Sequence, residues 1–201
     1  MEPLDIERAA IKLAFESNQL VTTFRLAASW LVDHPDDFVV VTWLGIVLYK
    51  MARYDEAIGL LTGVIERTKS EPLRYLLHLE MGQLERYRGR LDDSEPWFRQ
   101  AIELDPNDAT GYIYLGASEA RQGKLTEAET THRRGTECTA GAVDESFYNL
   151  GVVLRAQGRL EEAADCFRKA IEIDPDYSDF RDALSDIENA FPPAPHENPP
   201  G

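Results

Sequence analysis

One segment near the carboxyl end of the chain recurs upstream at intervals of about 34 residues. The segment LGVVLRAQGRLEEAADCFRKAIEIDPDY, residues 150–177, opens with a Leu-Gly pair that returns at residues 115–116. Its closing AIEIDP returns as AIELDP at residues 101–106, and its Gly-Arg-Leu turn returns at Gly89 and, as Gly-Lys-Leu, at Gly123. A period of this length is typical of proteins built from stacked helical repeats, so it constrains both the fold and the function.

Each repeat carries the same apolar pattern, which we describe by numbering its positions as slots. In residues 144–177, slots 4, 7, 8 and 11 are Phe147, Leu150, Gly151 and Leu154, and slots 20, 24, 27 and 32 are Ala163, Phe167, Ala170 and Pro175. The first four slots fall on one side of a helix and therefore face the second helix of the repeat. Glycine at slot 8 lets the two backbones approach closely. We expect the slot-20 alanines to meet that gap from the other side: Ala57, Ala128 and Ala163.

This pattern resembles the tetratricopeptide repeat. The resemblance implies an all-α, right-handed α-α superhelix, or solenoid, of stacked helix-turn-helix repeats. Four repeats are expected, at residues 38–71, 75–108, 109–142 and 144–177. We interpret residues 1–37 as a divergent repeat or helix pair, with Ile11 in place of the glycine, and residues 191–201 as a disordered proline-rich tail. Residues 178–190 are expected to form a capping helix, because a terminal repeat has no neighbour to cover its apolar edge.

Turns and caps are also predicted by residue type. The glycines that end the first helices are suited to a left-handed conformation: Gly89, Gly123 and Gly158. Three polar residues are placed to cap the second helices: Asp55, Asp93 and Thr126.

The second half of repeat 109–142 departs from the pattern. His132 takes the slot of the usual aromatic residue, Gly135 takes that of the usual alanine, and five threonines lower the helix propensity. A glycine within this helix would cost about 1 kcal/mol relative to alanine. We expect a weak helix supported by its neighbours, and the alternative is a flexible point or a place where a partner packs.

Composition excludes several classes of function. A net charge of −15 argues against a nucleic-acid partner, because phosphate binding needs a basic surface. No apolar run is long enough for a membrane span, and the amino terminus is acidic where a secretory signal would be basic, so a cytoplasmic protein is expected. Cys138 and Cys166 are interpreted as small apolar residues, since two cysteines cannot form a disulfide framework.

We find no pattern typical of an enzyme. The four histidines are scattered and form no HExxH pair, and the glycines form neither GxxxxGKS nor GxGxxG. The sequence therefore predicts no catalytic residues, no cofactor and no metal site.

A stripe on the first helices carries the candidate binding residues. Slots 2, 5, 9, 12 and 13 point away from the core and would be polar on an isolated helix, yet many hold aromatic, apolar or basic residues. In a tetratricopeptide superhelix this stripe would line the concave groove, which commonly holds a peptide. The candidates for contact with a partner are Trp43, Tyr49, Arg86, Tyr87, Arg121, Tyr148 and Arg155. Trp43, at slot 6, could equally be a core residue.

The expected function is that of a non-catalytic adaptor or scaffold that binds a partner peptide or helix. The carboxylate clamp of chaperone-binding relatives is doubtful here, because slot 5 holds Thr42, Leu79, Ile113 and Tyr148 instead of lysine. Two alternatives stay open: a homo-oligomer built by repeat stacking, and an RNA-binding helical repeat, which the acidity opposes.

Overall fold

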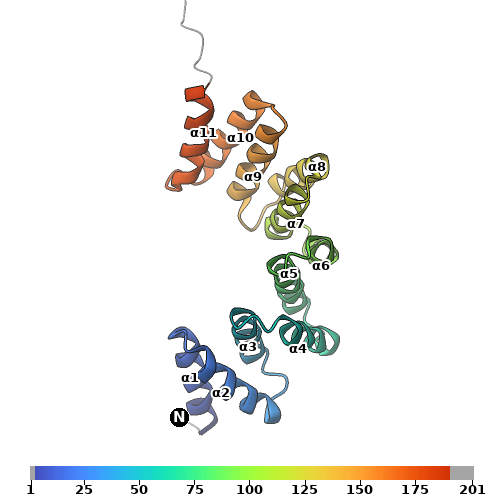
Figure 1. Ribbon diagram of the computed structural model, residues 1–201, viewed down its shortest axis with the longest axis vertical. Helices are drawn as coiled ribbons and strands as arrows, with labels where there is room; N and C mark the ends of the chain where they lie inside the picture. The colour runs from blue at the N-terminus through green and yellow to red at the C-terminus, as the bar shows by residue number, and fades with distance from the viewer. Residues whose placement is uncertain (1–2, 191–201) are drawn as a thin grey trace, which may run out of the picture. The chain divides into compact units, whose positions relative to one another are not determined.

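The computed structural model describes residues 3–190, with side chains from residue 6 onward, and the predicted tail lies outside this range. The described part is all-α and contains eleven helices and no strand (Figure 1). The helices are α1 (Pro3–Glu16), α2 (Leu20–Asp33), α3 (Phe38–Lys50), α4 (Tyr54–Arg67), α5 (Glu71–Tyr87), α6 (Leu91–Leu104), α7 (Ala109–Arg121), α8 (Leu125–Thr136), α9 (Val143–Ala156), α10 (Leu160–Ile173) and α11 (Ser178–Ala190).

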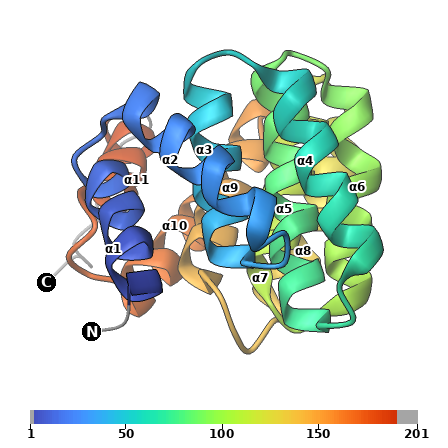
Figure 2. The ribbon, with the colours of Figure 1, turned by 90° about the horizontal axis from the view of Figure 1, so that it is seen from below.

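From α1 to α5 and from α7 to α11, helices that are consecutive in the chain pack against one another, as a helical repeat requires. Figures 1 and 2 both show α1 lying beside α2. The chain forms two compact units, Met1–Trp97 and Phe98–Gly201. Within each unit a first helix also contacts the next first helix, α1 with α3 and α7 with α9.

The core of the first unit extends into the divergent amino-terminal pair. Ile11 of α1 stands where a repeat would have glycine, yet only 1% of its surface is exposed. It belongs to one apolar cluster with Ala27 and Trp30 of α2 and Leu44 of α3. An apolar side chain therefore replaces the close backbone approach in this pair.

The carboxyl-terminal helix covers the last repeat. Ala183 and Ile187 of α11 join the cluster formed by Leu150 of α9 and Phe167 of α10. The ring of Phe180, also on α11, is buried as well. A capping helix is thus present, and it supplies the apolar neighbour that the last repeat would otherwise lack.

The gap at the slot-8 glycines is filled differently from our expectation. A Cβ atom placed on each glycine would meet the slot-24 side chain as its nearest neighbour. The pairs are Gly45 with Leu61, Gly116 with His132 and Gly151 with Phe167, at 3.2, 2.6 and 2.5 Å. The slot-20 alanines are fully buried, but among these nearest atoms the only contribution from one of them is a backbone oxygen, that of Ala163. A leucine, histidine or phenylalanine side chain from slot 24 thus reaches the first helix, whereas an alanine methyl group is shorter.

The turn glycines are confirmed, with φ angles of 77°, 78° and 80° for Gly89, Gly123 and Gly158. The predicted caps are wrong, because the second helices begin earlier than expected. Asp55 and Asp93 lie inside the first turns of α4 and α6, and Thr126 is the second residue of α8. Carboxylates in a first turn still favour the helix through its dipole, without a cap hydrogen bond.

Gly135 has a packing role that its helix propensity does not suggest. Helix α8 continues through it, and a Cβ atom there would lie 2.7 Å from Ser146 Oγ and 3.2 Å from Tyr112 Cβ. Because α7 and α9 both approach α8 at this point, only glycine fits. Tight packing therefore offsets the low helix propensity of Gly135, and α8 continues to Thr136.

Two glycines provide a matched test of this packing. Gly151→Ala would force the Phe167 ring away from α9 and should cost about 1–3 kcal/mol. Gly59→Ala, in the middle of α4 with no atom near its added methyl group, should instead stabilise the protein by about 0.5–1 kcal/mol. Urea unfolding followed by circular dichroism measures both changes, and equal effects would contradict the close approach.

His132 should make the stability of the second unit depend on pH. Burial lowers the pKa of its imidazole from 6.5 to about 4. The unfolded chain therefore binds the extra proton between pH 6.5 and 4, and folding stability falls as the pH drops through that window.

His132→Phe should remove this dependence, since Phe167 fills the equivalent slot against Gly151. Between pH 7 and pH 4 the variant should gain ~3 kcal/mol at most relative to the wild type. The difference between the two unfolding free energies, measured across this range, isolates His132 from the many carboxylates. Parallel pH profiles would show that His132 is not the cause.

Candidate functional site

The first unit has a hollow between α1 and α3, which are the first helices of its first two helix pairs. It measures about 410 Å³ and is lined by Arg8, Ala9 and Lys12 of α1 and by Val39 and Trp43 of α3. Helix α1 supplies one wall because its slots 5 and 9 point to the same side, and α3 supplies the other. Three of the lining residues, Arg8, Lys12 and Val39, occupy slots 5, 9 and 2 of the predicted stripe.

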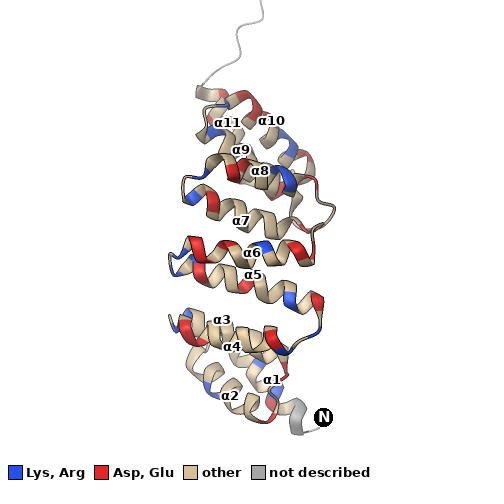
Figure 3. Ribbon diagram, turned by 90° about the vertical axis from the view of Figure 1, so that its right-hand side faces the viewer, with Lys and Arg blue, Asp and Glu red and all other residues tan. Residues whose placement is uncertain are grey.

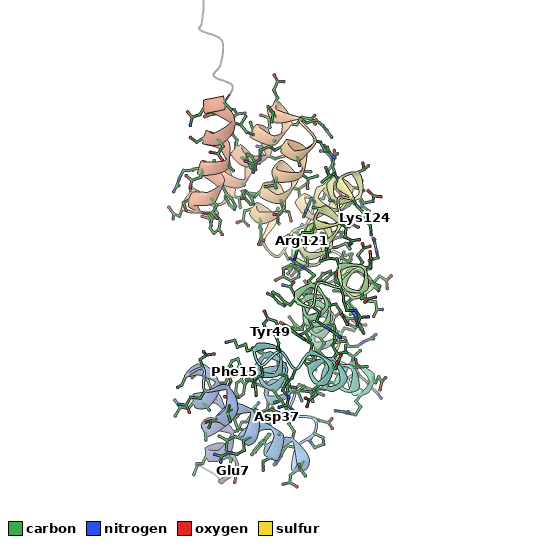
Figure 4. The ribbon with its side chains drawn as sticks, in the orientation of Figure 1. Glu7, Phe15, Asp37, Tyr49, Arg121 and Lys124 are labelled. Atoms are coloured by element: carbon green, nitrogen blue, oxygen red, sulfur yellow. The ribbon has the colours of Figure 1, made fainter. Side chains whose placement is uncertain are left out.

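Trp43, which the sequence left as either a groove residue or a core residue, contacts the core and also lines the hollow. One part of its ring packs against the core cluster of the first unit, and the indole stacks on Phe15 with the ring centres 5.6 Å apart (Figure 4 labels Phe15). The rest of the side chain lines the hollow, and no described residue accepts a hydrogen bond from its N–H group. The Trp43 ring is thus held in place by Phe15 and the core, and its indole N–H group has no hydrogen-bond acceptor among the described residues.

Two cations flank this hollow. Arg8 is held by Asp37, with 2.8 Å between Arg8 Nε and a carboxylate oxygen, and Asp37 also caps α3 by accepting a hydrogen bond from Val40 N. Lys12 makes only a long, exposed contact of 3.6 Å with Glu16. An exposed ion pair of this kind contributes little to stability, so the Lys12 ammonium group can leave Glu16 at low cost.

Farther along the same face, two predicted tyrosines meet. Tyr49 of α3 and Tyr87 of α5 have their ring centres 4.5 Å apart, and Tyr87 is 57% exposed. The pKa of Tyr49 is raised, first by burial and then by the neighbouring Tyr87 and Tyr54. Arg86 lies next to Tyr87 and donates a hydrogen bond to Gln83 Oε1 at 2.9 Å. The structure thus brings Tyr49 and Tyr87 together. On α3, Tyr49 lies nearer the carboxyl end of the helix than Trp43.

In the second unit the predicted residues are less available. Tyr148 lies between two buried rings, 5.7 Å from Phe167 and 5.2 Å from Phe180, and so helps to hold α11. Arg155 approaches Asp186 of α11 at 3.8 Å. Arg121 (labelled in Figure 4) is exposed and has no ion pair within the described part of the chain.

Helix α11 also brings residues to this surface that the sequence reasoning missed. A hollow of about 210 Å³ beside Tyr148 and Arg155 is lined by Asp179, Asp182 and Asp186. The surface beside Tyr148 and Arg155 is therefore acidic, although the first helices contribute an arginine there. The spacing of the aspartates, which places them on one side of α11, was the available signal.

Among residues 6–190, no group of three His, Cys, Asp or Glu side chains is arranged to hold a metal ion. Burial raises the pKa of the Cys166 thiol to about 11, which disfavours the reactive thiolate. None of the described helices is long and apolar enough to cross a bilayer. Charged residues of both signs are spread over the helices (Figure 3).

Comparison with known proteins identifies the repeats. Models of the tetratricopeptide repeat match residues 43–109, 79–142 and 145–177, which together make up about two thirds of the chain. The human tetratricopeptide repeat protein 7A is 30% identical over 93 residues, which are 46% of this chain and 11% of that protein. The chain thus spans only a small part of this curated relative.

Solved structures show the same fold. YrrB, described as a TPR protein with an unusual peptide-binding site, aligns with a TM-score of 0.62 and 23% identity over 87% of this chain and 88% of its own. The first TPR domain of RPAP3 (Spaghetti) bound to the HSP90 peptide SRMEEVD aligns with a TM-score of 0.55 and 19% identity over 58% and 94%. The repeat pattern, the helix packing and these matches agree that the chain belongs to the tetratricopeptide repeat family.

Proposed function

We propose that this chain is a non-catalytic adaptor or scaffold that binds a peptide or helix of a partner protein with the first helices of its repeats. Proteins of this family generally take part in protein–protein interactions, which supports the broader class. The fold neighbours YrrB and RPAP3 are described with peptide-binding sites or peptides, which supports a peptide as the ligand.

The hollow at Trp43 is the observation that carries the proposal. Interfaces concentrate their binding energy in tryptophan, tyrosine and arginine side chains that sit in well-packed pockets. Trp43 is already fixed by Phe15 and the core, so little side-chain entropy is lost when a partner covers it. An apolar side chain of the partner would fill the hollow between Val39 and Trp43.

The charges beside the hollow suggest the polar half of the ligand. Lys12 and Arg8 are the ionisable groups in its lining, so a carboxylate of the partner would be favoured there. The indole N–H of Trp43 could donate to a partner carbonyl group. This arrangement differs from the lysine and asparagine clamp of chaperone-binding relatives, because Trp43 stands at slot 6.

In the second unit, Arg121 is the predicted arginine that has no ion pair among the described residues. Arg155 already has Asp186 beside it, and the Tyr148 ring is largely occupied by α11. We therefore expect Trp43, Lys12 and Tyr87 to contribute more to partner binding than Arg155.

Substitution at the hollow tests the proposal. The wild-type protein, immobilised, captures partners from its native cell, and the principal partner is then measured by titration calorimetry. Trp43→Ala should weaken its binding tenfold or more, about 1.4 kcal/mol or above. Lys12→Glu, at an exposed position where the fold should be unaffected, should weaken it about fivefold through charge repulsion.

Tyr177→Ala serves as the matched control, because this half-exposed tyrosine lies in the α10–α11 turn and outside the face. It should leave the affinity unchanged. Circular dichroism verifies the fold of each variant. Unchanged binding by both folded hollow variants would disprove the proposal.

A further inference from the structure

The first unit has a second hollow, between α1 and α2, whose lining shares no residue with the hollow at Trp43. It measures about 300 Å³ and is lined by Glu7, Ala10 and Ile11 of α1 and by residues of α2: Leu26, Ser29, Trp30, Asp33 and His34. No residue of α3 takes part, so this is the side of the first helix pair that no later repeat covers. In the last repeat, the open edge is closed by α11.

The floor of this hollow is apolar and firm. Ile11 and Trp30 are nearly fully buried members of the core cluster. The Trp30 indole donates to Asp37 at 3.0 Å and stacks on His34 with 3.9 Å between the ring centres. A ligand would therefore meet a preformed surface, which lowers the entropic cost of binding.

The apolar surface continues along α1 beyond the hollow. Ile6 and Leu13 lie one turn on either side of Ala10 on the same helix face, and they are 53% and 66% exposed. A stripe formed by Ile6, Ala10 and Leu13 matches the apolar face of another helix. The size of this stripe therefore suits a helix better than a single side chain.

The charge at the rim identifies the kind of helix. Glu7 and Asp33 are exposed, and neither has an ion pair or a side-chain hydrogen bond among the described residues. The lining contains no lysine or arginine. Two unpaired carboxylates on either side of an apolar floor favour a ligand that carries lysine or arginine beside its apolar residues.

We propose that this edge binds a basic amphipathic helix of a partner protein, whose apolar face covers Ala10, Leu26 and Trp30. Its cations pair with Glu7 and Asp33. Such a helix would cover the apolar edge of the first helix pair, as α11 covers that of the last repeat. Its charge would differ, because α11 carries aspartates whereas this site favours cations. A second copy of this chain is a poorer occupant because its net charge is −15.

The test uses a synthetic leucine–lysine amphipathic peptide of about 18 residues as the probe. In ¹⁵N-labelled full-length protein, addition of the peptide should shift the amide signals of Ala10, Leu26 and Asp33 and the indole signal of Trp30. Shifts centred on Asp179, Asp182 and Asp186 of α11, or no saturable binding, would overturn the proposal.

Two variants separate docking from general attraction to an acidic protein. Glu7→Lys with Asp33→Lys should weaken the peptide about fivefold, whereas the control Glu66→Lys with Glu161→Lys, which changes the net charge equally at exposed positions elsewhere, should change it less than twofold. Ala10→Glu makes the protein more acidic but places a carboxylate in the hollow, so it should weaken binding about tenfold.

If Ala10→Glu binds the peptide as tightly as the wild type, the attraction is non-specific and the docking site is wrong. Sedimentation of the unliganded protein checks the competing occupant. A dimer that Ala10→Glu dissociates would assign the edge to a second copy instead of a basic helix. Neither result bears on the Trp43 hollow, so the two proposals fail independently.

Discussion

The close approach of two helices at the slot-8 glycine governs the rest of this structure. A side chain from slot 24 lies where the glycine has none, and this contact sets how near the second helix comes to the first. Leu61, His132 and Phe167 perform the same task in three repeats, although they differ in size and polarity. The close approach of the two helices therefore depends on a slot-24 side chain beside the glycine, and the polarity of that side chain can vary. At His132 a neutral imidazole is tolerated, with a cost that appears only when it must be protonated.

Once the pairs are formed, arginine–carboxylate contacts link positions about one repeat apart. Arg67 approaches Asp36 at 3.4 Å, Arg88 approaches Asp55 at 2.9 Å, and Arg159 approaches Glu129 at 2.8 Å. Each pair is at least partly exposed and contributes modestly on its own. Their recurrence ties each second helix or turn to the preceding repeat while the apolar clusters provide most of the stability. Many of the arginines are therefore committed to the architecture and are unavailable to a partner.

Features set by residue type within one repeat could be predicted from the sequence. The turns at Gly89, Gly123 and Gly158 need a positive φ angle, and the sequence predicted them because glycine adopts that conformation without strain. The helix starts depended on packing and not only on local capping preferences, so the caps at Asp55, Asp93 and Thr126 were wrong. The packing role of Gly135 could not be predicted for a similar reason, since the approach of Ser146 and Tyr112 is a tertiary contact. For the candidate site, the sequence predicted Trp43 as a contact residue, which stays a prediction, and it could not foresee how α11 would occupy Tyr148.

The unpaired charges distinguish the two proposed binding surfaces from the ion pairs that join the repeats of this acidic chain. Where a carboxylate already has an arginine beside it, as at Arg159 with Glu129 and Glu162, a partner must displace an existing contact and gains little. Glu7 and Asp33 have no such contact, and Lys12 has only a weak one, and all three lie beside apolar hollows in the first unit. The two hollows are lined by charges of opposite sign, so the two proposed sites would favour different ligands. A partner with both an acidic apolar segment and a basic amphipathic helix could engage them together, and the linked affinity would then exceed that of either segment alone.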